Sequence, residues 1–409
     1  MHWPHLQKES ARNIRKSVLH DRWVMLNASF GEAVGWERPM WFAPKESESK
    51  NIYSHTRPNW FEYTALECKA AREKAIILDQ SSFGKFLIQG SNACEFLQGI
   101  CSGNIDVEMG RIVYTHMLNS RGGIEVDLTV NRLDEDRFMI VSSATSQPRD
   151  HAWIARNIVT KPRATLTDVT SCYTVLSIQG PNSRDVLSSV SNADFSNEAF
   201  PFATSKSIEI GYAHAIANRL TFIGELGWEL YIESEFAQDI FDRIMDAGSD
   251  FGLKPTGYHA LEHLRCEKAY REFDLDLTPE DTPFEAGLGY TVDLDRPGDF
   301  TGRDSLLSQT EFGLLKKRLV MFKLNDPEPV LYGEEPIWLN GKIAGYLSSG
   351  AFSFTLGTSV GMGYVRQADG ITDDLTANGI WEIEIACERF AAVASLRTFF
   401  DPRRERVHR

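Results

Sequence analysis

A tight turn followed by an alternating strand, within residues 119–130, constrains the fold of this chain more than any other stretch. Gly122-Gly123 predicts a hairpin turn, because glycine adopts positive φ without steric cost. Apolar and polar residues then alternate with the period of a half-buried strand, which puts Glu125, Asp127 and Thr129 on one face. A carboxylate and a hydroxyl two residues apart on a rigid strand suit proton handling or a ligand amine, and a solvated strand face is the alternative.

Composition limits the classes of protein that this chain can belong to. Its 409 residues, 42% hydrophobic and 24% charged, are typical of a globular protein of two to three domains. The formal net charge of -14 argues against a nucleic-acid partner, since phosphate binding needs a basic face. We see no signal peptide and no apolar run of transmembrane length, so no membrane association is expected. Six scattered cysteines without a C-x-x-C motif indicate reduced thiols in a cytoplasmic protein.

Hydrophobic periodicity predicts strands that alternate with helices, followed by a tail of strands alone. This order indicates an α+β chain with a separate C-terminal β domain. In the first fifty residues we expect a helix and then no regular element, because glycines and Pro39 interrupt residues 30–42. Helices are expected over 61–75, 92–100, 149–157, 183–189, 237–247 and 258–270, and strands over 76–78, 86–88, 112–118, 124–130, 137–142, 175–179, 208–216, 220–223 and 224–232.

Several catalytic motifs can be set aside. His259 and His263, with Glu262 between them, match the H-x-x-E-H zinc-peptidase pattern. The surrounding leucines fit a packed amphipathic helix, and no further metal-ligand pattern follows, so we predict no metal site. No G-x-G-x-x-G follows an expected strand, and we find no P-loop and no G-x-S-x-G elbow. We therefore expect that this chain binds neither NAD nor a flavin.

Two acidic residues suggest a binding site for a heterocycle. Glu225 and Glu229 lie four residues apart, and on a strand this spacing turns both side chains the same way. A carboxylate can accept two parallel hydrogen bonds from an aminopyrimidine edge such as that of a pterin. A surface strand beside a glycine turn is the alternative.

A series of ordered motifs runs from about Trp36 to the C-terminal region. They lie at 35–39, 41–44, 57–61, 78–86, 122–130, 224–231, 264–271, 277–288 and 348–353. Together these motifs resemble the glycine-cleavage T-protein (aminomethyltransferase) family, and most strongly the folate-binding C-terminal half of dimethylglycine and sarcosine dehydrogenases. The resemblance implies a three-domain cloverleaf around a central channel that holds tetrahydrofolate, with a C-terminal β-barrel domain. The corresponding division is an N-terminal extension over 1–55, an α+β folate-binding domain over 56–170, a second α+β domain completing the folate site over 171–310, and the barrel over 311–409.

The resemblance also implies roles for individual residues. The catalytic set implied is Asp127, Thr129 and Tyr114. The folate-binding set implied is Glu229, Phe222, Glu225, Arg265, Tyr270, Ser142 and Phe83. Phe222 stands where the family usually has a tyrosine, so that hydroxyl contact is lost. The T-protein's Asp-Val-Ser-His-Met is Asp-Gln-Ser-Ser-Phe here, ending at Phe83. The missing histidine counts against a lipoyl-carrier substrate and favours the dehydrogenase-like branch.

Two aromatic clusters precede the Asp127 strand and are candidates for substrate binding. Aromatic faces bind quaternary ammonium or sulfonium groups, an arginine can pair with a substrate carboxylate, and packing in the core is the alternative. The candidate substrate residues are Trp36, Trp41, Arg38, Trp60 and Arg57.

Three functions remain open. The related dehydrogenases carry a flavin domain that this chain lacks, and its Met1 start and length predict a complete stand-alone protein. We expect first a tetrahydrofolate-dependent methyltransferase or demethylase that takes a methyl group from a small N-methylated, quaternary ammonium or sulfonium compound and gives 5-methyltetrahydrofolate. The second is a detached folate-binding subunit of a dimethylglycine or sarcosine dehydrogenase, which would make 5,10-methylenetetrahydrofolate with a flavoprotein oxidoreductase partner. The third is a non-catalytic folate-binding protein.

Overall fold

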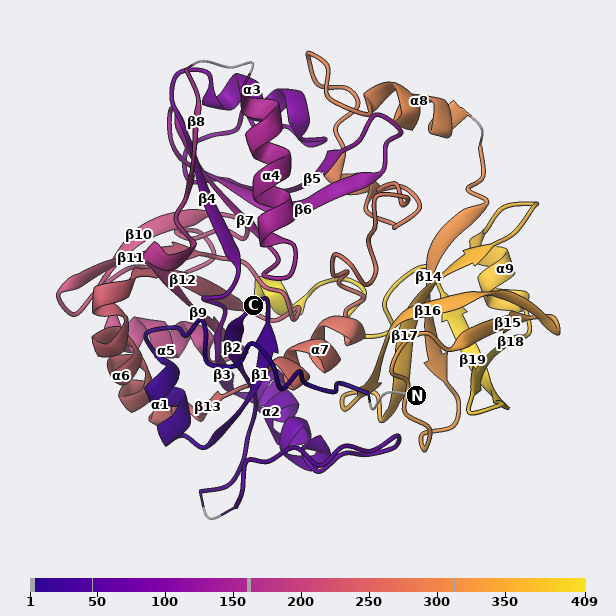
Figure 1. Ribbon diagram of the computed structural model, residues 1–409, viewed down its shortest axis with the longest axis horizontal. Helices are drawn as coiled ribbons and strands as arrows, with labels where there is room; N and C mark the ends of the chain where they lie inside the picture. Colours follow the sequence, from indigo (N-terminus) through magenta and orange to yellow (C-terminus); the bar gives the residue numbers. More distant parts are fainter. Residues whose placement is uncertain (1–3, 46, 160–162, 312) are drawn as a thin grey trace. The chain divides into compact units, whose positions relative to one another are not determined.

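The computed structural model describes residues 4–45, 47–159, 163–311 and 313–409 (Figure 1). Contacts divide the chain into two compact units, and neither unit is continuous in sequence. Unit 1 consists of the segments up to Phe83, from Val169 to Arg265 and from Arg403 onward. Unit 2 consists of residues 84–168 and 266–402. Among the described residues, no helix combines the length and the apolar character that a membrane crossing requires.

Unit 1 is built on a six-stranded sheet in the order β10-β11-β12-β9-β3-β13, antiparallel except for the parallel pair of β13 and β3. Its strands are β3 (Ala75–Asp79), β9 (Tyr173–Gln179), β10 (Ser205–Ile210), β11 (Ala213–Asn218), β12 (Gly227–Glu233) and β13 (Leu253–Pro255). Its helices are α1 (His20–Met25), α2 (Phe61–Glu73), α5 (Ser183–Val190), α6 (Ala237–Gly248) and α7 (Tyr258–Glu267, which ends just past the unit's boundary), with 3₁₀ turns η1 (Thr170–Cys172), η2 (Ser234–Phe236), η3 (Ser249–Phe251) and η5 (Arg406–His408). Apolar faces of the sheet, α5 and α6 form its core, which includes Trp23 and Trp228.

Residues 30–42 are regular, and the expectation of an irregular stretch there is wrong. Strands β1 (Ala28–Ala33) and β2 (Trp36–Phe42) form an antiparallel pair. The turn between them is possible because Val34 and Gly35 both adopt positive φ, 49° and 80°, as tight hairpin turns require. Pro39 is tolerated because it lies beside a bulge in a sheet of only two strands.

Unit 2 begins with a five-stranded antiparallel sheet in the order β5-β6-β7-β4-β8. Its strands are β4 (Gly84–Gln89), β5 (Ile112–Leu118), β6 (Ile124–Asp134), β7 (Arg137–Ser142) and β8 (Thr165–Asp168), and its helices are α3 (Ala93–Ile100) and α4 (Gln147–Ile158). Strand β6 confirms the alternation expected from the sequence, because the side chains of Ile124, Val126, Leu128 and Val130 are buried whereas the intervening polar residues are only partly buried. Apolar residues of α3 and α4 pack against this sheet and complete its core.

The C-terminal part of unit 2 is a closed six-stranded barrel in the order β14-β17-β16-β15-β18-β19, which confirms the predicted β-barrel. Its strands are β14 (Lys317–Leu324), β15 (Pro336–Leu339), β16 (Lys342–Ser353), β17 (Thr358–Arg366), β18 (Trp381–Ile385) and β19 (Glu388–Ser395). The other elements of this part are η4 (Gly289–Thr291), α8 (Arg303–Glu311) and α9 (Asp373–Asn378). Apolar side chains fill the barrel, among them Phe322 and Trp381. The α+β class is therefore confirmed, whereas the division into four sequence segments stays a prediction.

Helix α7 is shorter than its hydrophobic pattern suggested. It ends at Glu267, three residues before the expected Tyr270. Ala269 adopts a left-handed backbone conformation, φ 54°, which is incompatible with a continuing right-handed helix. Tyr270 therefore lies in the irregular segment beyond the helix and not on the same element as Arg265.

Candidate functional site

Strands β5 and β6 bring the three predicted catalytic residues together. In the register of this hairpin, Asp127 on β6 lies opposite His116 on β5, and Thr129 lies opposite Tyr114. These pairs are direct cross-strand neighbours, so their side chains meet on the same face of the sheet. The side chain of Asp127 is 16% exposed, which leaves part of the carboxylate accessible.

Asp127 has two polar neighbours on β5. Its Oδ1 atom lies 3.1 Å from Nε2 of His116. The hydroxyl of Tyr114 forms a hydrogen bond with the Asp127 carboxylate, and burial together with this negative charge raises the pKa of Tyr114 well above its usual range. Tyr114 therefore stays protonated and acts as a donor to Asp127.

His116 is not among the site residues predicted from the sequence. Its side chain is fully buried, and its Nδ1 atom lies 3.0 Å from the hydroxyl of Thr291 in η4. The signal that could have found it is the hairpin register. That register depends on the turn and on a bulge between Met117 and Leu118, which the hydrophobic pattern does not reveal.

Helix α4 adds two charged residues that were also missed. Arg149 forms an ion pair with the Glu125 carboxylate and also donates to the Glu125 carbonyl oxygen. Asp150 is fully buried and accepts a hydrogen bond of 2.6 Å from Ser146. Burial raises the pKa of Asp150 to about 7, with a smaller contribution from the negative charge of Asp127. Ser142, a predicted folate-binding residue, ends β7 opposite Leu128 and is buried.

Glu229 lies on β12 in unit 1, as the sequence predicted, and is partly buried. Its carboxylate accepts a hydrogen bond of 2.9 Å from the hydroxyl of Tyr231. Burial raises the pKa of Glu229 to about 7, so the carboxyl changes charge near neutral pH. A partly accessible carboxylate of this kind matches the acceptor that an aminopyrimidine edge requires.

Glu225 does not share a strand face with Glu229, and that expectation is wrong. Strand β12 begins only at Gly227, and Gly224 adopts a positive φ of 71°, so Glu225 lies in the turn before the strand. The Glu225 carboxylate is buried and receives Nη1 of Arg72 at 2.7 Å and Nε of Arg406 at 2.5 Å. Two arginines thus satisfy one of its oxygens within the protein.

The other predicted folate-binding residues have varied settings. Phe222 and Phe83 are partly buried and lie outside strands. Arg265 on α7 is buried and pairs with Glu262 at 2.7 Å. Their roles, and that of Tyr270, stay predictions.

The predicted substrate tryptophans are packed against other side chains of unit 1. Trp41 is 1% exposed, stacks on Tyr63 and donates from Nε1 to Asn51 at 2.8 Å. Trp60 is 3% exposed and stacks on the His259 ring with 4.7 Å between centroids. These contacts favour the packing alternative. The remaining members pair with neighbours too: Trp36 with the Arg15 guanidinium, Arg38 with the Tyr258 ring and Arg57 with the Phe61 ring.

The H-x-x-E-H residues lie on α7, as their pattern predicted. His259 is buried against Trp60, and burial, together with the nearby His5 and His263, lowers its pKa well below the usual range. Within the described part of the chain, no three or more His, Cys, Asp or Glu side chains are grouped so as to hold a metal ion.

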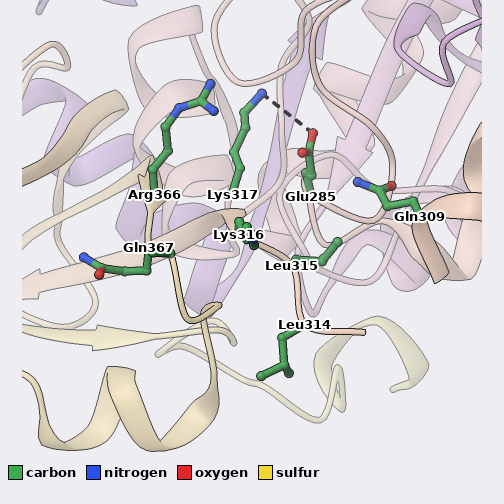
Figure 2. A pocket seen from close by; sticks show the side chains of 9 residues that line it. Glu285, Gln309, Leu314, Leu315, Lys316, Lys317, Arg366 and Gln367 are labelled. Atoms are coloured by element: carbon green, nitrogen blue, oxygen red, sulfur yellow. Dashed lines mark ion pairs between the residues drawn. The ribbon is translucent and has the colours of Figure 1, made fainter. Parts of the chain in front are cut away.

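A separate pocket of about 620 Å³ lies in unit 2 (Figure 2). Figure 2 shows Lys317 extended toward Glu285, to which it is ion-paired at 3.7 Å, with Arg366 beside it. Lys317 also forms an ion pair with Asp281. None of the predicted catalytic or folate-binding residues lines this pocket, so we do not assign it to the folate.

Two family models cover most of the chain. The GCVT N-terminal domain matches residues 19–296, and the glycine cleavage T-protein C-terminal barrel domain matches residues 317–401. The chain therefore belongs to the glycine cleavage T-protein family, the aminomethyltransferase family that its motifs indicated.

Individual relatives point to the same family. The chain is 39% identical over 407 residues to 4-methylaminobutanoate oxidase (formaldehyde-forming) of Paenarthrobacter nicotinovorans, a match that covers 100% of this chain and 48% of the relative. It is 35% identical over 448 residues to the mitochondrial sarcosine dehydrogenase of Mus musculus, with 99% and 48% covered. The chain thus spans about half the length of these two curated relatives. The crystal structure of the glycine cleavage system aminomethyltransferase T from Bartonella henselae matches with a TM-score of 0.78 at 22% identity, over 93% of this chain and 96% of that one, and this likeness shows a shared fold.

Proposed function

We propose that this protein transfers a one-carbon unit from an N-methylated amine to tetrahydrofolate. The observation that carries the proposal is the Asp127 cluster. A partly accessible carboxylate lies on a rigid strand beside Tyr114 and His116, and the resemblance of this strand's motif to the family motif implies a catalytic role for it. Membership of the family supports tetrahydrofolate as the acceptor of the carbon.

Asp127 would accept a proton from the folate. When a folate nitrogen forms a bond to carbon, it loses an N–H proton, and a positioned carboxylate can accept that proton. Tyr114, which stays protonated, would orient Asp127 through its hydrogen bond. Enclosure of the reactants and alignment of the carbon with the attacking nitrogen would supply most of the remaining acceleration.

The oxidation level of the transferred carbon distinguishes two possible reactions. We favour a methylene unit, delivered as an iminium ion, because the relatives named above are an oxidase and a dehydrogenase of N-methylated amines. The two N–H protons of tetrahydrofolate would be replaced by one methylene group, and both would finally reside on the released amine. The iminium would come from a flavoprotein oxidoreductase.

A redox-neutral methyl transfer is the second candidate. It is the reaction expected first from the sequence. In this reaction a quaternary ammonium or sulfonium donor would pass its methyl group to tetrahydrofolate and leave as the neutral amine or sulfide. Asp127 would accept the displaced N–H proton, and 5-methyltetrahydrofolate would form.

Glu229 is proposed to bind the pterin. Its carboxylate would accept hydrogen bonds from the ring N–H and the amino group, with Tyr231 fixing its orientation. This role supports the proposal independently of Asp127 and can be tested separately.

Mass spectrometry of the folate product tests the proposed function. The protein is incubated with tetrahydrofolate and donors carrying an N-[¹³C]methyl group, namely sarcosine, dimethylglycine, 4-methylaminobutanoate and glycine betaine, with and without a flavoprotein amine dehydrogenase. A scavenger of free formaldehyde separates enzymatic transfer from spontaneous condensation. Labelled methylene product that needs the flavoprotein and survives the scavenger supports methylene transfer, and labelled 5-methyl product without it supports methyl transfer. Binding of tetrahydrofolate without any product would indicate a non-catalytic protein and contradict the proposal.

A further inference from the structure

Three cationic side chains, those of Lys316, Lys317 and Arg366, line the pocket of about 620 Å³ in unit 2 (Figure 2). The chain as a whole carries a formal net charge of -14, so the charge gathered at this pocket is opposite in sign to that of the molecule. Acidic neighbours can neutralise such cations within the fold. What the pocket can bind therefore depends on which of the three already has a partner.

The charge of Lys317 is neutralised within the protein. Its ammonium group pairs with Asp281 and, at 3.7 Å, with Glu285. It also donates to the carbonyl oxygen of Glu280 at 3.1 Å. All three members of the ion-pair group are largely shielded from solvent. The carboxylate that lines the pocket, Glu285, thus already has a cation.

Arg366 and Lys316 keep an uncompensated charge. Both side chains are exposed, and within the described part of the chain no acidic side chain forms an ion pair with either of them. In the antiparallel register Arg366 on β17 lies directly opposite Lys317 on β14, so the two side chains share one face of the sheet. Like charges in such a pair repel each other. An anion bound at Arg366 would offset this repulsion.

The rest of the lining supplies a further donor and an apolar surface. Oε1 of Gln309 accepts the hydroxyl of Thr282 at 2.8 Å, which leaves the amide nitrogen of Gln309 as a donor to a ligand. Leu314 is 59% exposed and lines the pocket together with Leu315. The pocket therefore combines cations, a neutral donor and an apolar wall, which is the composition of a site for an organic anion.

Backbone contacts hold this wall against the end of β17. The N–H of Gln367 donates to the carbonyl oxygen of Lys316 at 2.9 Å. Gly370 packs against Leu314 so closely that a Cβ at residue 370 would lie 2.5 Å from the Cβ of Leu314. The backbone that carries the cations and the apolar wall is thus fixed before a ligand arrives, which lowers the entropy cost of binding.

We propose that this pocket is a second ligand-binding site, separate from the residues assigned to the folate, and that it binds a small organic monoanion, namely a carboxylate on an apolar body. The planar guanidinium of Arg366 would donate two parallel hydrogen bonds to the carboxylate, with Lys316 adding charge and Gln309 a further donor. The apolar body would lie on Leu314 and Leu315. The proposal does not depend on the proposed function.

The charge and size of the pocket favour a carboxylate over a phosphate. Glu285 lies beside the two uncompensated cations, and its negative charge would repel a dianion more strongly than a monoanion. A bare phosphate would also leave the leucine wall without a contact. The volume lies within the range of about 300–1,000 Å³ that small-molecule sites occupy, so an organic acid with an apolar body fits.

Calorimetric titration of the full chain with 4-phenylbutanoate tests the proposal. Its amide, 4-phenylbutanamide, has nearly the same shape without the charge, and inorganic phosphate is an anion without an apolar body. We expect saturable binding of the carboxylate and at least tenfold weaker binding of the amide and of phosphate. Binding of the carboxylate should weaken as sodium chloride is added, because salt screens exposed charges.

Substitutions locate the binding in the pocket. Arg366→Gln should raise the Kd for 4-phenylbutanoate at least tenfold, and Lys316→Gln should raise it by a smaller factor. The exposed Arg397, which does not line the pocket, supplies the matched control, and Arg397→Gln should leave Kd within twofold of wild type. The Tm of Arg366→Gln should not fall, because the substitution removes the repulsion from Lys317.

Three results would overturn the proposal. A wild type that shows no saturable binding of 4-phenylbutanoate has no such site. An equal Kd in the wild type and in folded Arg366→Gln would place the binding elsewhere, and a lowered Tm with that equal Kd would assign Arg366 a structural role. Tighter binding of phosphate than of the carboxylate would show that the ligand class is wrong.

Discussion

Glu229 combines burial with a change of charge near neutral pH, and this makes its role testable. Only the ionised carboxylate can accept both hydrogen bonds of an aminopyrimidine edge. Since burial raises the pKa of Glu229 to about 7, we expect tetrahydrofolate to bind more tightly as pH rises from 6 to 8. Calorimetric titration of the wild type should show this gain. Glu229→Gln should lower the affinity by about 1.5–3 kcal/mol and remove the pH dependence. Unchanged affinity in the variant would exclude Glu229 from the site.

The buried tryptophans give a second prediction at the scale of single residues. Trp60 is 3% exposed and one face of its ring is covered by His259, so removing part of the ring leaves a cavity. Trp60→Leu should lower the free energy of unfolding by about 2–4 kcal/mol, while KM for the amine stays unchanged. Thermal unfolding and steady-state kinetics of the same preparation measure both. A raised KM with an unchanged Tm would restore Trp60 to the predicted aromatic cage.

At the scale of elements, Glu225 joins the turn before β12 to a distant segment of the chain. Its carboxylate pairs with Arg72 on α2 and with Arg406 in η5, and Arg406 also donates to the Arg72 carbonyl oxygen. Nearby, Val407 is buried, and its carbonyl oxygen accepts from Arg219 at 3.2 Å. These bonds fasten residues 403–409 to the rest of unit 1.

Glu225→Gln tests this fastening. It leaves two arginines without their charge partner in a buried setting, and we expect a loss of about 3–5 kcal/mol in the free energy of unfolding. Denaturant unfolding of the variant measures the loss. As a control, removal of the exposed ion pair between Arg243 and Asp239 by Asp239→Asn should lower the free energy of unfolding far less, because solvent screens an exposed pair. If the two variants were equally stable, the Glu225 pair would be dispensable and its assignment to folate binding would regain support.

The elements that could be predicted from the sequence are those with a strong period. The period of two in β6 predicted which side chains are buried, and the helices α3, α5 and α6 follow apolar residues at helical spacing. Features set by a few backbone angles could not be predicted this way. The turn between β1 and β2 depends on positive φ at Val34 as well as at Gly35. The end of α7 depends on positive φ at Ala269.

The site was predictable only in part, for the same physical reason. Asp127 lies on a strand whose own pattern predicted its exposure. His116 became visible only when the register of the β5–β6 hairpin was known, and Asp150 only when α4 was packed against the sheet. Contacts between residues far apart in sequence carry no local periodic signal.

For the molecule as a whole, buried titratable groups predict how stability depends on pH. Burial raises the pKa of Glu67 to about 8, and it lowers the pKa of His259 well below its usual range. As pH rises past the unfolded-state pKa of a histidine, about 6.5, the pH dependence that His259 contributes to stability fades. Glu67 still contributes, because the folded protein keeps a proton that the unfolded chain has released.

Stability should therefore fall as pH rises from about 6.5 to 8, by up to about 1.4 kcal/mol per pH unit from Glu67 alone. Differential scanning calorimetry across this range measures the effect. Glu67→Gln should be less stable at pH 6.5, since one of the backbone N–H groups of Phe42 and Gly257 loses its acceptor, but its Tm should vary less with pH. A Tm that rises toward pH 8 in the wild type would contradict the assignment.

The central claim is that Asp127 takes a proton as carbon is transferred to tetrahydrofolate, and a single-turnover measurement with Asp127→Asn tests it most directly. The wild type and the variant are saturated with tetrahydrofolate, mixed with the labelled donor that the product survey identifies, and quenched at intervals for mass analysis. Asparagine keeps the shape but cannot accept the proton as a carboxylate does. The account predicts a rate of labelled folate formation at least about 100-fold lower, the scale of general base catalysis, with tetrahydrofolate affinity within a few-fold of wild type. Equal rates in the two proteins would contradict it.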